Sequence, residues 1–184
     1  MAENPLEKFA EDPQREDRPR EDGPLDDGPQ QDGPRWLDGT EARVWLGYRR
    51  MRALLDLRIA RELMRDSGLS EPDYDVLSNL TAAPEHRCRL NELAAVMVWS
   101  NSRLSHHLTR MQQRGLVARE ECADDARGAM VVLTEAGRAA IEAAAPSHVA
   151  SVRRNFFDLL SAEQLGRLED FTDTLLRHLA STED

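Results

Sequence analysis

Apolar residues recur at intervals of three and four between positions 44 and 63, which is the spacing of one face of an α-helix. The members of this first stripe are Val44, Tyr48, Met51, Leu55, Ile59 and Leu63. A second stripe makes the same helix apolar on another side; its members are Trp45, Leu54, Leu57 and Met64. We therefore expect the helix to touch two partners, its own core and a second subunit. Thr40 is expected to cap it, with Glu41 in its first turn, and Gly68 to end it.

A second helix is predicted from the run Ser70-Glu71-Pro72-Asp73. This run combines a capping serine, a proline in the first turn and an acidic residue three positions after the cap. We expect Tyr74, Leu77 and Leu80 to form its buried face. Pro84 closes the segment.

Two short helices are predicted next, over residues 90–97 and 101–114, with a break at 98–100 and Gly115 as the C-terminal cap. Two helices joined by a tight turn form a helix-turn-helix. Within the second of them the residues expected to face inward are Leu104, Leu108 and Met111. The residues left on the outer surface are Ser102, Arg103, Ser105, His106 and Arg110. Val98 stands where helix-turn-helix proteins often have glycine, and because a β-branched residue disfavours positive φ, we expect no left-handed residue there.

Two short strands, 116–121 and 130–133, follow directly, joined by residues 122–128. A β-hairpin after a helix-turn-helix is a wing. Thr134 is then expected to cap a helix that reaches about Ala145, is bent or broken at Pro146 and resumes to about Leu160. A capping box at Ser161-Ala162-Glu163-Gln164 opens a last helix, whose apolar stripe is Leu165, Leu168, Phe171, Leu175 and Leu179. The predicted fold class is mainly α with a small β-hairpin wing, a winged helix-turn-helix flanked by long dimerisation helices.

The acidity of the chain is concentrated at its start. Residues 1–40 hold 12 acidic and 5 basic side chains, whereas residues 41–184 hold 22 acidic and 19 basic ones. The net charge of −10 therefore does not argue against binding of nucleic acid by the rest of the chain. Residues 1–35, rich in Pro, Gly and acidic side chains, are expected to form a disordered tail. No stretch is apolar enough for a membrane span and the start is acidic, so we expect a cytoplasmic protein with no membrane partner.

Two motifs resemble one family. The first is the run Leu90-Asn91-Glu92-Leu93-Ala94 … Ser100-Asn101-Ser102-Arg103-Leu104-Ser105 … Leu108-Thr109-Arg110-Met111 … Arg114-Gly115-Leu116-Val117. The second is Asp125-Ala126-Arg127-Gly128 … Leu133-Thr134-Glu135-Ala136-Gly137. They are similar to the reader and the wing of MarR family transcriptional regulators. The resemblance covers residues 36–182 and implies a reader at 90–115, a wing at 116–133 and dimerisation helices within 36–67 and 135–182.

The outer face of the 100–114 helix is the candidate DNA-reading surface, because a major groove admits one α-helix. Ser100 and Ser102 are placed to donate to phosphates at the positive end of that helix. Arg103 and His106 are the candidates for base edges. Asn101 and Ser105 lie behind them, and Arg110 is expected to meet a phosphate. A solvated polar face is the alternative interpretation.

The wing supplies the second predicted contact. The resemblance implies that Arg127 enters the minor groove, and Asp125 is placed to orient that arginine by an ion pair. An exposed surface pair is the alternative. Because one reader covers half a site, we expect a homodimer on a pseudo-palindromic operator, with half-sites about 10 bp apart. Binding near a promoter would usually make the protein a repressor, although members of the family also activate.

A small-molecule effector is a further partner that the resemblance suggests, since the family commonly senses ligands between the dimerisation helices and the reader. Five residues could line such a cleft, or could be core or interface instead: Trp45, Tyr48, Arg49, Arg52 and Tyr74.

Other functions find less support in the chain. A redox switch would use Cys88 or Cys122, neither of which lies in the first helix, where the family's peroxide sensors keep their cysteine. A zinc sensor could draw on His86, Cys88, His106, His107, His148 or His178, but no pair has a zinc-site spacing. We expect no catalytic residues, cofactor or metal, because no phosphate loop, nucleophile elbow or paired-metal motif is present. A protein-docking winged helix is the alternative from another class, although it would have no need of Arg127.

Overall fold

The computed structural model describes residues 35–122 and 125–181, without the side chains of residues 121, 122 and 125–128. Contacts between Cα atoms divide the chain into Met1–Leu37 and Asp38–Asp184. Every described helix and strand belongs to the second unit. The predicted disordered tail, residues 1–35, falls outside the described residues except for Arg35.

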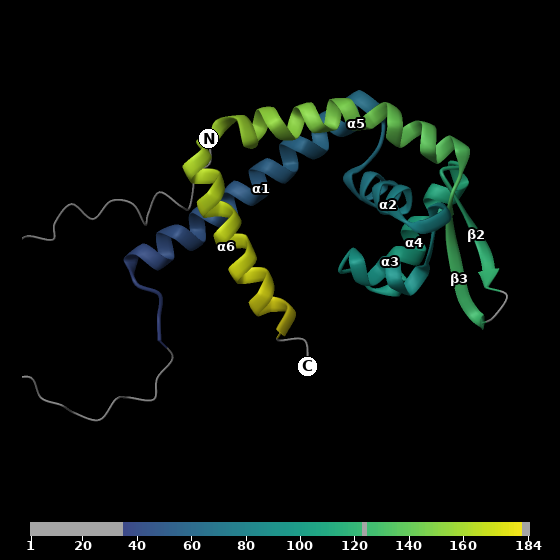
Figure 1. Cartoon of the computed structure of the whole chain (residues 1–184), viewed down its shortest axis with the longest axis horizontal. Helices are drawn as coiled ribbons and strands as arrows, with labels where there is room; N and C mark the ends of the chain where they lie inside the picture. Colours follow the sequence, from purple (N-terminus) through teal and green to yellow (C-terminus); the bar gives the residue numbers. More distant parts are fainter. Residues whose placement is uncertain (1–34, 123–124, 182–184) are drawn as a thin grey trace, which may run out of the picture. The chain divides into compact units, whose positions relative to one another are not determined.

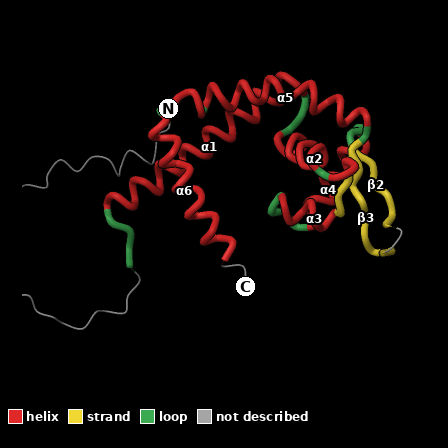
Figure 2. Tube along the Cα trace, viewed as in Figure 1, coloured by secondary structure: helices red, strands yellow, loops and turns green. Residues whose placement is uncertain are grey.

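Most of the described residues lie in helices, and three strands form a small sheet (Figures 1 and 2). The elements are α1 (Gly39–Ser67), α2 (Glu71–Ala82), β1 (Arg87–Arg89), α3 (Leu90–Val96), α4 (Asn101–Gln113), β2 (Val117–Cys122), β3 (Asp125–Leu133), α5 (Glu135–Asn155) and α6 (Ala162–Ser181). Short 3-10 helices at Pro84–His86 and Phe157–Leu159 complete the described elements. The predicted order of helices, two-helix reader, hairpin and two more helices is confirmed.

The start of α1 is capped by Asp38, so the prediction that Thr40 caps it is wrong. Oδ1 of Asp38 accepts hydrogen bonds from the backbone N–H groups of Thr40 (2.7 Å) and Glu41 (2.8 Å). The Glu41 carboxylate accepts from the N–H of Asp38 in return, which completes a capping box. An aspartate two residues upstream of Thr40 satisfies two free N–H groups at once and therefore sets the start of the helix. The end is as predicted, with Gly68 at φ 69°.

The core lies between α2, the reader and the sheet. Ser70 caps α2 and Asp73 completes its capping box, as predicted. Leu77 and Leu80 are fully buried, and Val76, which the predicted stripe omitted, is fully buried too. Tyr74 is only half-buried. These side chains pack with apolar residues of α3, α4, β2 and β3 in one continuous core.

The wing sheet has three strands in the order β1-β3-β2, all antiparallel. β3 begins at Asp125 rather than at Met130, so the hairpin is longer and its loop shorter than predicted. Residues 125–129 are polar or small and show no apolar alternation, so the sequence did not indicate this extension. Their backbone nevertheless pairs with β2 as far as Cys122. The strand β1 was not predicted; three residues, Arg87–Arg89, are too few for a period of two to stand out.

The sequence predicted a helix bent or broken at Pro146; the helix α5 is unbroken there, so the break is wrong. It ends at Asn155, so the predicted end near Leu160 is wrong as well. Proline removes one backbone hydrogen bond, but bonds to α1 hold the later part of this helix. Glu62 of α1, nearly buried, accepts hydrogen bonds from Ser151 (2.6 Å), Arg154 (2.7 Å) and Asn155 (3.2 Å). The Ser151 bond, followed by Arg154, lowers the pKa of Glu62 to about 2.

The predicted apolar stripes of α1 and α6 are largely exposed in the single chain. On α1 only Leu63 of the first stripe is buried, while Val44 and Met51 remain 64% and 48% exposed. The helix α6, whose predicted Ser161 capping box is present, has no buried residue at all. The chain therefore does not cover these faces by itself.

Candidate nucleic-acid interface

The helix α4 presents a polar face outward because its apolar face is anchored in the core. Leu104, Leu108 and Met111 have no exposed surface, as the sequence predicts. Ser100 caps the helix by accepting a hydrogen bond from the N–H of Arg103 (3.2 Å). Gly115 follows the helix with φ 73°, a conformation that glycine adopts without strain.

Most of the predicted DNA-reading residues lie on this outer face. The exposed ones are Ser100, Asn101, Ser102, Arg103, His106 and Arg110. Ser105 differs from them, being half-buried beneath Arg119 of β2, which donates to the Ser105 carbonyl and lies 3.4 Å from its hydroxyl. The structure thus brings six of the candidates onto one surface and turns the seventh toward the wing.

The turn between α3 and α4 does contain a left-handed residue: Val98 has φ 53°. The prediction that this valine would avoid positive φ is therefore wrong. Backbone hydrogen bonds from Val98 N to Ala95 O (3.0 Å) and from Trp99 N to Ala94 O (2.8 Å) close the turn tightly. These two bonds impose a conformation that a β-branched residue does not choose on its own. The Val98 side chain itself is 85% exposed.

Arg103 rests on an aromatic ring. Its guanidinium carbon lies 3.9 Å from the centre of the Trp99 ring, which is half-buried and packs against the core. Trp99 in turn meets the ring of His107 edge-on, at 5.7 Å between centroids and an interplanar angle of 87°. A candidate base-reading side chain is thus supported from below by two core-anchored rings.

Beneath this face lies a buried carboxylate, Asp73, at the start of α2. It pairs with Nη1 of Arg114 (2.6 Å), and Nε2 of His107 lies 3.1 Å from its other oxygen, at an angle outside that of a regular hydrogen bond. Burial acts to raise the pKa of Asp73, but the hydrogen bonds from Arg114 and Ser70 outweigh it and the pKa is lowered. Burial lowers the pKa of His107 below its ordinary 6.5, more than the nearby Asp73 raises it.

Near the tip of the wing, residues 125–128 are described only as backbone. Asp125 and Arg127 belong to β3, and their side chains lie outside the described part of the structure. The base of the wing is well defined. The hydroxyl of Thr134 donates toward the carbonyls of Gly115 (2.7 Å) and Leu116 (2.9 Å) and accepts from the N–H of Gly137 (3.0 Å), which caps α5 as predicted.

The residues predicted to line an effector cleft lie on two helices, α1 and α2. Trp45 and Tyr48 stack on each other on α1 with 6.0 Å between ring centroids, and both are exposed. Arg49 and Arg52 lie on the same helix, exposed. Tyr74 instead contacts His148 of α5, with ring centroids 4.1 Å apart.

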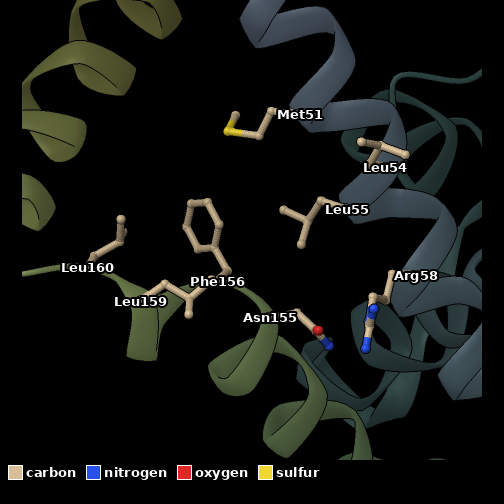
Figure 3. A pocket seen from close by; sticks show the side chains of 8 residues that line it. All are labelled: Met51, Leu54, Leu55, Arg58, Asn155, Phe156, Leu159 and Leu160. Carbon is tan, nitrogen blue, oxygen red and sulfur yellow. The ribbon is translucent and has the colours of Figure 1, made fainter.

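A groove of about 370 Å³ lies between α1 and the end of α5 and contains none of these predicted residues (Figure 3). Its lining is mainly apolar: Met51, Leu54, Leu55, Arg58, Asn155, Phe156, Leu159 and Leu160. The ring of Phe156 points into the space between the two helices.

Several alternatives can be compared with the described residues. Burial raises the pKa of the Cys88 thiol, the reverse of what a reactive thiolate needs. Within residues 35–122 and 125–181, no three His, Cys, Asp or Glu side chains gather as a metal site would require. None of the described helices is long and apolar enough to cross a membrane.

Sequence reasoning missed the residues that support the reading face from behind. They are Asp73 in this role, Trp99, His107, Arg114 and Arg119. One signal was available: His107 follows Leu104 by three positions, which places it on the inward face of the helix. No local pattern indicated that Arg114 and Arg119 would reach Asp73 and Ser105, because those contacts join distant parts of the chain.

Helix-turn-helix, three-stranded wing and flanking helices together define a winged helix-turn-helix protein. The MarR family model matches residues 67–128. AbsC, a MarR family transcriptional regulator from Streptomyces coelicolor, is 40% identical, with a TM-score of 0.76 over 81% of this chain and 100% of its own. Sco3205, a MarR family regulator of the same organism solved in complex with DNA, is 37% identical, with a TM-score of 0.78 over 83% of this chain and 96% of its own.

A further relative is an HTH-type transcriptional regulator of Bacillus cereus that carries no assigned role. It is 28% identical over 122 residues, which are 66% of this chain and 79% of the relative. The identities and the coverage of the Streptomyces structures show that this chain belongs to the MarR family. It is accordingly a DNA-binding transcriptional regulator with a winged helix-turn-helix, and not an enzyme.

Proposed function

We propose that the protein is a repressor that binds a pseudo-palindromic operator as a homodimer, with α4 in the major groove and Arg127 of the wing in the minor groove. The observation that carries the proposal is the division of α4 into two faces. Its apolar side chains are fully buried, while Arg103, His106 and Arg110 are exposed on the other side. A helix fixed in this way can present the same side chains to a groove in every complex.

The exposed apolar faces of α1 and α6 support the homodimer. Leu54, Leu57 and Phe171 are each about half exposed, and several more large apolar side chains accompany them. Extended apolar surface of this kind marks an interaction site on a soluble chain. The relative Sco3205 was solved in complex with DNA, and an isologous dimer would present two copies of α4 to a two-fold symmetric site.

We also propose that a small-molecule effector releases the protein from its operator. The groove of Figure 3 could admit a small apolar ligand, and binding there would bridge α1 and α5. Alternatively, the second subunit fills it. Thermal unfolding with a panel of apolar and aromatic acids separates the two: stabilisation together with release of operator supports an effector, whereas no shift favours an interface.

Selection from a randomised duplex pool, repeated at several salt concentrations, tests the proposed function. We expect enrichment of a two-fold symmetric motif and an affinity that falls steeply as salt rises, since phosphate contacts release counterions. The Arg103→Ala variant should lose preference at particular base pairs. A matched control, Arg167→Ala, removes one exposed arginine from α6 and should leave that preference intact. Failure of the wild-type protein to enrich any motif would favour the protein-docking alternative.

A further inference from the structure

Two of the exposed arginines on α4 do not extend freely into solvent but are held by side chains beneath them. Arg103 lies on the Trp99 ring, and Nη2 of Arg110 lies 3.0 Å from Nδ1 of His107. Arginine has a flexible side chain, and a guanidinium that is held beforehand loses less freedom when it meets its target.

The Trp99 ring, which supports Arg103, is itself held in place by the fold. Its position follows from the strained turn at Val98 and from the hydrogen bond of its N–H to the Ala94 carbonyl. The ring packs on the core and against the edge of His107. A tryptophan face offers the strongest attraction to a cation among the aromatic side chains. The left-handed turn at Val98 therefore places the face of the Trp99 ring under Arg103.

The support of Arg110 depends on the protonation of His107. A guanidinium can only donate, so Nδ1 of His107 must accept, and the ring proton then resides on Nε2, facing Asp73. The lowered pKa of His107 agrees with this neutral form. Asp73 is in turn held by Arg114, which also donates to the Gly68 carbonyl (3.2 Å). A chain of contacts thus leads from the junction of α1 and α2 to both arginines.

We propose that Trp99 and His107 are positioning residues for DNA recognition: Trp99 holds Arg103, and His107 holds Arg110, in the arrangement in which they meet the operator. The inference rests on the proposed function of α4. Neither Trp99 nor His107 touches DNA in this scheme. Their effect on affinity passes entirely through the two arginines.

A double-mutant cycle tests the first half. Operator affinity is measured for Trp99→Leu, Arg103→Ala and the double variant. Trp99→Leu keeps apolar bulk but removes the aromatic face, and should weaken binding about two- to fivefold. Arg103→Ala should weaken it about tenfold or more. The double variant should match Arg103→Ala alone, because Trp99 has nothing left to position.

Thermal unfolding separates positioning from packing. Trp99→Leu should lower the unfolding temperature by the same amount whether or not Arg103 is present, since that loss reports on the core. Trp99→Phe keeps an aromatic face and should restore part of the affinity. Equal weakening by Trp99→Leu in both backgrounds, or no weakening at all, overturns the inference while leaving the proposed function intact.

The second half uses two replacements of His107. Asparagine keeps an acceptor near the place of Nδ1, whereas leucine keeps only apolar volume. His107→Asn should retain most of the operator affinity, and His107→Leu should lower it severalfold, but only while Arg110 is present. Equal affinities of the two variants overturn this half. If the wild-type protein selects no operator, the proposed function fails and the inference fails with it.

Discussion

The reader and the long flanking helices carry similar apolar stripes, but the stripe of the reader is buried within the chain and the stripes of the flanking helices are exposed. Along α4 the side chains of Leu104, Leu108 and Met111 are completely buried, whereas on α6 Phe171 and Leu175 remain 46% and 42% exposed. Both stripes have the spacing of an amphipathic helix. The chain buries the first stripe by itself but leaves the second exposed. The reader therefore needs no partner to cover its apolar face, whereas the flanking helices do. In the proposed dimer, the second copy supplies what α1 and α6 lack.

Charged residues in the exposed apolar stripe of α6 should disrupt the proposed dimer. Leu175→Asp combined with Leu179→Asp should leave the fold of the reader unchanged, because α6 buries no residue in the chain. It should convert the dimer into a monomer and weaken operator binding about 100-fold or more, since two linked readers bind with avidity. Light scattering after gel filtration and operator titration measure the two effects.

The matched control for that variant is Arg177→Asp, on the same helix, which changes the net charge by the same amount as two Leu→Asp substitutions. It should preserve the dimer and most of the affinity. A dimer that survives the leucine variant would show that α6 is not part of the interface.

A substitution inside the reader should act on stability instead. Leu108→Ala removes a side chain with no exposed surface, which costs about 2–5 kcal/mol of unfolding free energy through lost burial and a cavity. Denaturant unfolding monitored by circular dichroism gives the value. Gln112→Ala, at an exposed position of the same helix, is the comparison; a similar loss for both would contradict the division of α4 into a buried and an exposed face.

Acid should destabilise the fold through two histidines, His107 of the reader and His148 of α5. Burial lowers the pKa of both His107 and His148 below 6.5. A group with a lowered pKa in the folded state binds protons more readily when unfolded, so stability is full above pH 6.5 and is lost as pH falls below it. We expect a lower unfolding temperature at pH 5.5 than at pH 7.5, and a smaller difference in His107→Asn. Equal temperatures in the wild-type protein would contradict the buried neutral state.

The smallest expected effect comes from relieving the turn. Val98→Asn should stabilise the protein by about 0.5–1 kcal/mol, because asparagine tolerates the left-handed conformation far better than valine. The valine side chain is 85% exposed, so little burial is lost. Val96→Asn, 67% exposed on the neighbouring helix α3, is the control and should bring no gain. Thermal unfolding compares the two, and destabilisation by Val98→Asn would mean that the turn is not strained.

What the sequence predicts correctly follows from local rules. Caps such as Ser70 and Thr134, the Gly68 ending and the inward face of α4 each depend on neighbours within one or two turns. Where two local signals competed, the prediction was wrong: Asp38 captured the cap expected of Thr40. At Pro146 a local rule was overridden by the bonds that Glu62 makes with the later part of α5.

The reading face shows the same limit. Its exposed residues could be predicted from helical spacing, but their support could not, because Asp73 and Arg114 are 41 positions apart. Val98 illustrates the point most clearly, since residue preference argues against its conformation and the tertiary structure imposes it. The side chains of the wing tip and the effector residues remain predictions.

The junction at Thr134 determines how motion can pass through the molecule. A side chain added at Gly137 would place its first carbon 2.0 Å from the Leu116 carbonyl oxygen, so the first turn of α5 rests directly on the start of the wing. Together with the Thr134 hydrogen bonds, this contact joins the end of α4, the base of the wing and the start of α5 into one rigid unit. We therefore expect the wing to travel with α4 as a single body, and a change in the separation of the two readers of the proposed dimer to originate farther along α5.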